Sequence, residues 1–273
     1  MIMWELVESF PTRHGVVRWT CAGRGSPVVL LHGTPFSSRV WHDVATGLAR
    51  RHTVYLWDMP GYGRSEMRAG QDVSFVAQQE VFTDLLREWG LIEPAVVAHD
   101  VGGTVALRAA LLSGVRYARL ALVDAVSVRP WGSDFFRLVR ENAEVFGQLP
   151  GSLHEALVRR YLVSAAHRVL PADLLAELAR PWLGAVGQDA FYRQIAQADE
   201  RFTQEMEDRY PELDLPVLVA WGAEDAWLPV DRAHTLAGVI PNARLEMIAQ
   251  AGHLVQFDAP GALTALLDEF LAD

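Results

Sequence analysis

The chain has 273 residues, of which 51% are hydrophobic, and its formal net charge at pH 7 is −10. This size and apolar content suit one domain with a substantial core and room for an inserted subdomain. The negative charge argues against nucleic acid or an anionic membrane as the main partner, because both attract clustered Lys and Arg. A single cysteine excludes an intramolecular disulfide and a cysteine-rich zinc site.

The N-terminal stretch MIMWELVESF is acidic and alternating, without the basic and then apolar order of a signal peptide. No apolar run approaches the roughly 20 residues that span a bilayer. We therefore expect a cytoplasmic protein that is a monomer or a small homo-oligomer.

Short apolar runs alternate with helical patterns along most of the chain. The runs have the length of buried strands and cover residues 26–33, 52–58, 93–100, 118–125, 215–222 and 243–249. Helical spacing fills most of the intervals, as in SFVAQQEVFTDLLREWG at 74–90. Continuous apolar strands that alternate with helices indicate an α/β protein with a parallel sheet covered on both faces.

This alternation breaks once, between residues 128 and 213. The segment reads as successive helices with Pro and Gly at their junctions, and the chain returns to a strand near Pro216. We interpret 128–213 as a helical cap, or lid, and 1–127 with 214–273 as the core domain.

Chemically active side chains gather where the predicted strands end, which is where parallel sheets collect their reactive groups. They are His32-Gly33-Thr34-Pro35, Asp58, Asp100, Asp124, Asp225 and His253.

Asp100 stands in the pattern AHDVGG, with Ala98 before it and Gly102 and Gly103 after it. A sharp strand-to-helix turn that presents a nucleophile needs small residues at those flanks, because the helix packs closely on the strand. The usual pattern is G-x-S-x-G, so Asp100 occupies the place of serine. Asp is also a common helix N-cap, and this stretch alone supports both roles equally.

The surrounding motifs favour the catalytic role. The turn VLLHGTP supplies the backbone amide of Thr34 as one half of an oxyanion hole, and the amide of Val101 after the nucleophile is the other half. Downstream, Asp225 in VAWGAEDAWLP and His253 in IAQAGHLVQFDAP complete the order nucleophile, acid, base.

With these motifs the sequence resembles the α/β-hydrolase superfamily over nearly its whole length. The stretches HGTPFSSRVWHDV, DMPGYGRSE, AHDVGG and AGHLVQFDAP resemble its aspartate-nucleophile branch, which contains epoxide hydrolases, haloalkane dehalogenases and fluoroacetate dehalogenases. The resemblance implies an α/β-hydrolase fold with a mostly parallel eight-stranded sheet and a helical lid.

An ionised carboxylate can displace a leaving group from saturated carbon, whereas serine first needs a base to remove its proton. The product is an ester of Asp100, which water activated by His253 then hydrolyses. The resemblance favours Asp225, 28 residues before His253, as the acid that orients this histidine. Asp124, 24 residues after Asp100, is the alternative.

The leaving group distinguishes the candidate reactions. Epoxide hydrolases resemble one another in having two lid tyrosines that protonate the departing oxygen, and Tyr192, 61 residues before His253, matches the second. Tyr161 lies later in the chain than the position at which the first of these tyrosines is expected. Dehalogenases commonly carry Trp after the nucleophile or Asn after His-Gly, where this chain has Val101 and Thr34.

We therefore expect an epoxide hydrolase that takes a small hydrophobic substrate. A haloalkane or haloacid dehalogenase is the alternative, followed by an ester or lactone hydrolase or a non-hydrolytic ligand-binding protein of the same fold. No metal and no organic cofactor is expected. The predicted pocket wall comprises Phe36, His99, Trp131, Phe135, Phe136, Trp182 and Phe191.

Overall fold

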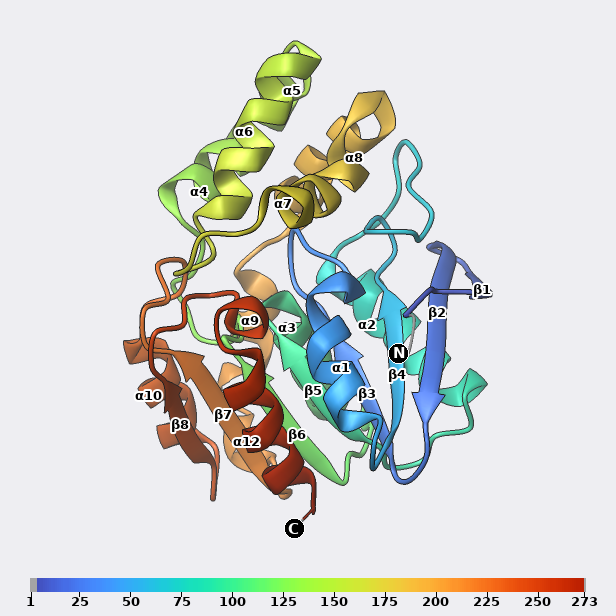
Figure 1. The fold of residues 1–273 in the computed structure, drawn as a ribbon, viewed down its shortest axis with the longest axis vertical. Helices are drawn as coiled ribbons and strands as arrows, with labels where there is room; N and C mark the ends of the chain where they lie inside the picture. Colours follow the sequence, from blue (N-terminus) through green and yellow to red (C-terminus); the bar gives the residue numbers. More distant parts are fainter. Residues whose placement is uncertain (1–3, 273) are drawn as a thin grey trace.

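The structure, a computed structural model, describes residues 4–272. Within this range eight strands form one sheet in the order β1-β2-β4-β3-β5-β6-β7-β8 (Figure 1). Only β2 runs antiparallel to its two neighbours, so the predicted eight-stranded, mostly parallel sheet is confirmed. The strands are β1 Glu8–Thr12, β2 Gly15–Gly23, β3 Pro27–Leu31, β4 Thr53–Asp58, β5 Ala95–His99, β6 Arg119–Val123, β7 Val217–Gly222 and β8 Arg244–Ile248.

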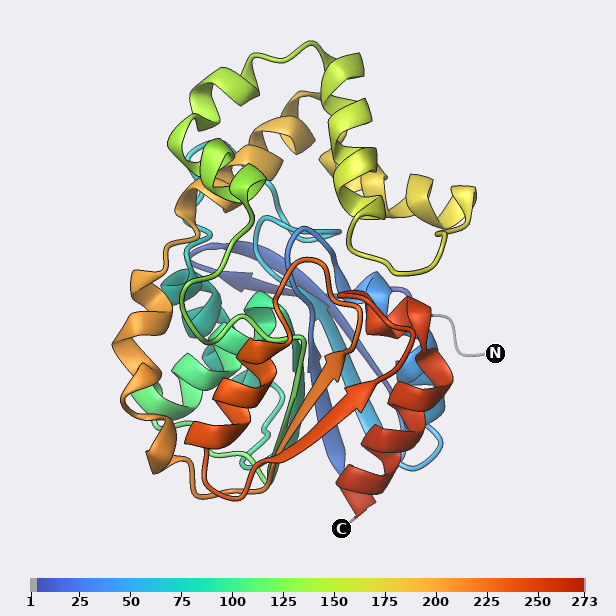
Figure 2. The same cartoon turned by 90° about the vertical axis from the view of Figure 1, so that its left-hand side faces the viewer.

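Helices cover both faces of this sheet, which explains why β5 and β7 are buried at every position. Figure 2 shows α1 and α12 on one face and α2, α3 and α10 on the other. The core helices are η1 Ser38–Trp41, α1 His42–Leu48, α2 Phe75–Glu88, α3 Val101–Ser113, α10 Asp231–Val239, α11 Val255–Asp258 and α12 Pro260–Ala272.

Most of the helices between β6 and β7 form a layer above the carboxyl ends of the strands (Figures 1 and 2). Pro and Gly stand at several of their junctions, as the sequence suggested. These helices are α4 Asp134–Glu141, α5 Ala143–Gly147, α6 Gly151–Val163, α7 Ala172–Ala179, η2 Arg180–Trp182, α8 Gly184–Gln197, α9 Arg201–Glu207 and η3 Tyr210–Glu212.

The chain from 184 to 207 is divided between α8 and α9. Ala198 is extended, and the Asp199 carboxylate accepts a hydrogen bond from the Arg201 amide, which starts the new helix. Helix α9 then packs against the core helix α3, where the Arg108 guanidinium donates to the Phe202 carbonyl. The last part of the inserted segment thus lies against the core.

Among residues 4–272, no helix is long and apolar enough to cross a membrane.

Candidate active site

Asp100 forms the sharp turn between β5 and α3. Its backbone has φ 52° and ψ −125°, a left-handed conformation that residues other than glycine rarely adopt. The glycines after it are required by contact, because a Cβ on Gly102 would lie 2.6 Å from the His32 carbonyl oxygen, and one on Gly103 would lie 2.5 Å from the Ala125 Cβ. Within the described chain the Asp100 carboxylate makes no capping hydrogen bond to α3, so the N-cap interpretation is wrong.

Backbone amides hold one oxygen of this carboxylate. The Thr34 amide donates to Asp100 Oδ1 at 2.7 Å, and the Val101 amide also bonds to the carboxylate. The His32 imidazole supports the turn that carries Thr34: it accepts from the Met59 amide at 2.9 Å through Nε2 and donates to the Gly33 carbonyl through Nδ1. The two amides predicted for an oxyanion hole therefore both lie at the Asp100 carboxylate, and that of Thr34 binds Oδ1.

His253 lies between two carboxylates. Its Nδ1 is 2.9 Å from Asp225 Oδ2, and its Nε2 is 3.4 Å from Asp100 Oδ2. The Trp227 and Leu228 amides fix the other oxygen of Asp225 at 2.7 and 2.9 Å. Asp225 is thus positioned to select the His253 tautomer that has a proton on Nδ1.

Asp124, the alternative acid, makes a different contact. Its Oδ1 accepts from the Gly222 amide at 2.7 Å, while its Oδ2 has no hydrogen-bond partner among residues 4–272. Burial, and then the nearby charge of Asp225, raise the pKa of Asp124 well above its ordinary value. Asp225 bonds to Nδ1 of His253, whereas Asp124 makes no such contact within residues 4–272, so the geometry favours Asp225 as the orienting acid.

Asp100 and His253 stabilise each other's charged forms. Burial alone would raise the pKa of Asp100, but the hydrogen bond and charge of His253 outweigh it and hold that pKa below its ordinary value. Burial alone would lower the pKa of His253, but the carboxylates of Asp225 and Asp100 raise it well above the ordinary value. Each shift favours the charged form of its group, and each depends on the charge of the other group.

This coupling predicts that Asp100→Asn lowers the pKa of His253, since the amide removes the charge and keeps the size of the side chain. NMR titration of the His253 imidazole measures the shift. An ester at Asp100 removes the same charge, so His253 becomes a base at a lower pH in that state than in the resting protein. Asp124→Asn is the control and should leave the pKa unchanged; an unchanged pKa in Asp100→Asn contradicts the coupling.

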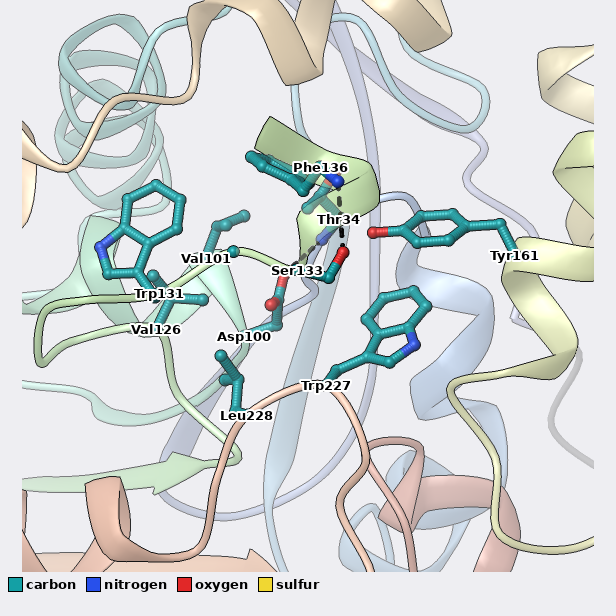
Figure 3. Close-up of a pocket in the computed structure, with 11 residues that line it drawn as sticks. Thr34, Asp100, Val101, Val126, Trp131, Ser133, Phe136, Tyr161, Trp227 and Leu228 are labelled. Atoms are coloured by element: carbon teal, nitrogen blue, oxygen red, sulfur yellow. Dashed lines mark hydrogen bonds between the residues drawn. The ribbon is translucent and has the colours of Figure 1, made fainter. Parts of the chain in front are cut away.

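A small cavity opens above Asp100 (Figure 3). Its polar groups are Asp100, Thr34, Ser133 and the Tyr161 hydroxyl, which points from α6 toward the centre of the cavity in Figure 3. Its other walls are apolar, as expected of a small-molecule site. The lining residues are Thr34, Asp100, Val101, Val126, Trp131, Gly132, Ser133, Phe136, Tyr161, Trp227 and Leu228.

Comparison with known proteins identifies the family. A family model described as the alpha/beta hydrolase fold matches residues 26–260. The chain belongs to the α/β-hydrolase family. An uncharacterised protein of Mycobacterium tuberculosis is 32% identical to this hydrolase over 96% of the chain and 80% of the relative. A 2-hydroxymuconate semialdehyde hydrolase of Pseudomonas putida is 29% identical over 92% of the chain and 89% of its own length.

Solved structures agree with this assignment. An α/β-hydrolase fold protein from Burkholderia ambifaria superposes with a TM-score of 0.94 at 44% identity, covering 97% of this chain and 98% of the other. An epoxide hydrolase and an ancestral haloalkane dehalogenase superpose with TM-scores of 0.77 and 0.82, but at 21% and 18% identity they show the fold alone.

The structure places Tyr192, predicted as the leaving-group donor of this hydrolase, away from the cavity. Its hydroxyl lies 2.8 Å from Nδ1 of His154, another cap residue, and Tyr192 is not among the lining residues of the described chain. Tyr161 lines the cavity instead. Its ring stacks on Trp227 with centroids 4.5 Å apart, and Trp227 in turn stacks on His253 at 5.1 Å.

Most of the aromatic residues predicted to form the pocket wall do not line the cavity. Trp131 and Phe136 line the cavity, but the other five residues do not. Phe36 packs behind Trp227, Phe135 packs on the outer side of Tyr161, and Phe191 packs on Trp182, whose indole donates to the Pro35 carbonyl.

His99 was predicted in the pocket wall, but its side chain contacts the backbone of His253 instead. Its Nε2 donates to the His253 carbonyl at 2.8 Å, and burial, followed by the charge of His253, lowers its pKa to about 3. His99 is therefore neutral and supports the backbone of His253.

Trp227 and Leu228 were absent from the sequence prediction. They are the second and third residues after Asp225 in the stretch EDAWLP, and their amides bind its carboxylate while their side chains line the cavity. Adjacency to the predicted acid is the signal that could have identified them. The same turn therefore orients His253 and forms a wall of the pocket.

Proposed function

We propose that this α/β-hydrolase opens epoxides on hydrophobic, uncharged substrates through a covalent ester of Asp100. The observation that carries the proposal is the Tyr161 hydroxyl above Asp100 in an otherwise apolar cavity. Burial, and then the charge of Asp100, raise the pKa of Tyr161, so the phenol keeps its proton at neutral pH. A neutral phenol can donate a proton to an epoxide oxygen as the ring opens.

In the first step, Asp100 Oδ2 attacks an epoxide carbon, and the bond between that carbon and the ring oxygen breaks. Tyr161 gives its proton to this oxygen, which becomes the first hydroxyl of the product. Oδ1, which the Thr34 amide binds, becomes the carbonyl oxygen of the ester.

In the second step, His253 takes a proton from water, and the water oxygen attacks the carbonyl carbon of Asp100. The two amides stabilise the negative charge that develops on Oδ1. The intermediate then releases the second hydroxyl of the diol, which receives a proton from His253. His253 is then neutral, Asp100 releases the remaining proton of the water to solvent, and Tyr161 regains its proton from solvent.

The indole groups of the cavity support epoxide rather than halide chemistry. Trp131 Nε1 donates to Thr203 Oγ1 at 3.0 Å, and Trp227 Nε1 donates to Ser164 Oγ at 3.1 Å. Each indole has a single donor, so neither is available to a departing halide. Neither Lys nor Arg lines the cavity within residues 4–272, which disfavours a carboxylate substrate such as a haloacid.

A panel of aryl and alkyl epoxides and haloalkanes tests the proposal, with diol and halide measured in parallel. We expect diol from epoxides and no halide release. Halide release without diol would favour the dehalogenase alternative, and turnover of esters or lactones alone would favour an acyl-transfer reaction.

Tyr161→Phe is expected to lower kcat for epoxides about 10²-fold, because positioned proton donors contribute on that scale. Tyr192→Phe is the matched control. It also removes a hydroxyl group from the cap, but one that bonds to His154. Diol formation by both variants is the measurement. Equal activities of the two variants would contradict the role of Tyr161.

A further inference from the structure

Cap helix α8 bonds to the core at the turn that carries the oxyanion amide. The Gln194 side chain is 2% exposed, and its Oε1 accepts a hydrogen bond from Thr34 Oγ1. The Tyr62 hydroxyl lies 3.2 Å from the same Oε1 and 3.3 Å from Thr34 Oγ1. Three side chains, one from the cap and two from core loops, thus form one buried polar cluster.

The residue that Gln194 holds is the one that contacts the predicted nucleophile. Thr34 receives the cap contact through its side chain, and its backbone amide donates to Asp100 Oδ1 at 2.7 Å. A second cap contact reaches the next residue, since Trp182 Nε1 donates to the Pro35 carbonyl at 2.7 Å. On the core side, His32 supports the same turn. The core and the cap therefore hold this turn together.

The cluster carries an unfavourable feature that packing alone does not explain. Gln194 Nε2 is buried and has no hydrogen-bond partner among residues 4–272. A buried donor without a partner costs free energy, and an apolar side chain of similar size would avoid that cost. The acceptor Oε1, which two hydroxyl groups approach, is the feature of Gln194 that an apolar residue lacks.

We propose that Gln194 is a positioning residue that holds the Thr34 amide on the oxyanion of Asp100. This inference rests on the proposed covalent mechanism. Hydrolysis of the ester depends most on the amide, because a full negative charge then develops on Oδ1. Loss of the Gln194 contact therefore slows ester hydrolysis more than ester formation.

Gln194→Met tests this, since methionine keeps the length of the side chain and removes the acceptor. We expect kcat for an epoxide to fall about tenfold or more, with little change in KM. We also expect the Asp100 ester to accumulate at steady state, detected as added mass on the intact protein. Thr34→Val breaks the same contact from the core side and replaces Gln194→Met in the test if that variant folds poorly. The variant that carries both substitutions should be no slower than the slower of the two single variants.

Two glutamines of α8 provide matched controls. Gln188 Nε2 bonds within the cap, to the Gly147 and Leu149 carbonyls. Gln197 links the cap to the core elsewhere, accepting from the Val73 amide and donating to the Gln71 carbonyl. Gln188→Met and Gln197→Met should keep wild-type kcat and accumulate no ester.

Gln194→Glu tests whether the acceptor oxygen of Gln194 is the feature that positions Thr34. A buried carboxyl group stays neutral and its carbonyl oxygen accepts hydrogen bonds, so this variant should recover most of the activity. Wild-type kcat and no trapped ester in Gln194→Met would overturn the proposal, as would equal losses in all three methionine variants or failure of Gln194→Glu to recover. A wild-type protein that forms no ester with any epoxide would instead overturn the proposed function.

Discussion

Asp100→Asn is expected to abolish epoxide turnover, with kcat reduced on the order of 10⁴-fold to 10⁶-fold, the scale seen when a catalytic nucleophile is removed. A neutral amide lacks the negative charge that attacks saturated carbon. The change is nearly isosteric, so the Thr34 amide keeps an oxygen to bind. Steady-state diol formation is the measurement, and thermal unfolding checks that the variant is folded.

Asp124→Asn is the matched control for this prediction. Asp124 is also a buried aspartate at the end of a strand, but burial raises its pKa, so an uncharged amide should replace it at little cost. We expect activity close to that of the wild type. A loss as large as that of Asp100→Asn would contradict the roles assigned to the two residues, and retention of more than a tenth of kcat by Asp100→Asn would contradict the nucleophile.

His253→Gln is expected to trap the ester. The variant lacks the base that activates water, whereas the charge and amide contacts of Asp100 that support alkylation persist. One equivalent of epoxide should bind covalently, and kcat should fall about 10³-fold to 10⁴-fold, by analogy with the loss of a triad base. Intact mass followed by peptide mapping should locate the adduct on Asp100.

His99→Phe is the control for this experiment, because His99 supports the His253 backbone without facing the cavity. It should turn over more slowly than the wild type without accumulating one equivalent of ester. Absence of an adduct in His253→Gln across the whole epoxide panel would contradict a covalent route.

The strands and the order of the reactive residues were predictable because they depend on local pattern. Continuous apolar runs specify buried parallel strands, and the carboxyl ends of such strands meet at one edge. The small residues around Asp100 report directly on the close contacts of the turn, such as that of Gly102 with the His32 carbonyl.

The cap was less predictable, since tertiary packing determines which side of each cap helix faces the core. Spacing from His253 selected Tyr192, yet Gln194, two residues further along α8, contacts the oxyanion turn while Tyr192 contacts His154. In an α-helix, residues two apart point to different sides, so a small error in register exchanges a buried packing residue for a site residue.

His99 illustrates a similar limit for a strand. It immediately precedes Asp100, but successive side chains along a strand point to opposite faces, so adjacency to the nucleophile did not place it in the cavity. Its bond to the His253 carbonyl comes from a residue 154 positions away, a contact that local pattern does not reveal.

The central claim is that the oxygen transferred to the substrate comes from Asp100 and that water replaces it there. A single turnover with excess protein in water enriched in heavy oxygen tests this most directly. The proposed mechanism predicts a diol without the heavy isotope in the first turnover and a heavier peptide that contains Asp100. Heavy oxygen in the first-turnover diol, with an unlabelled Asp100 peptide, would show direct attack by water and contradict the account.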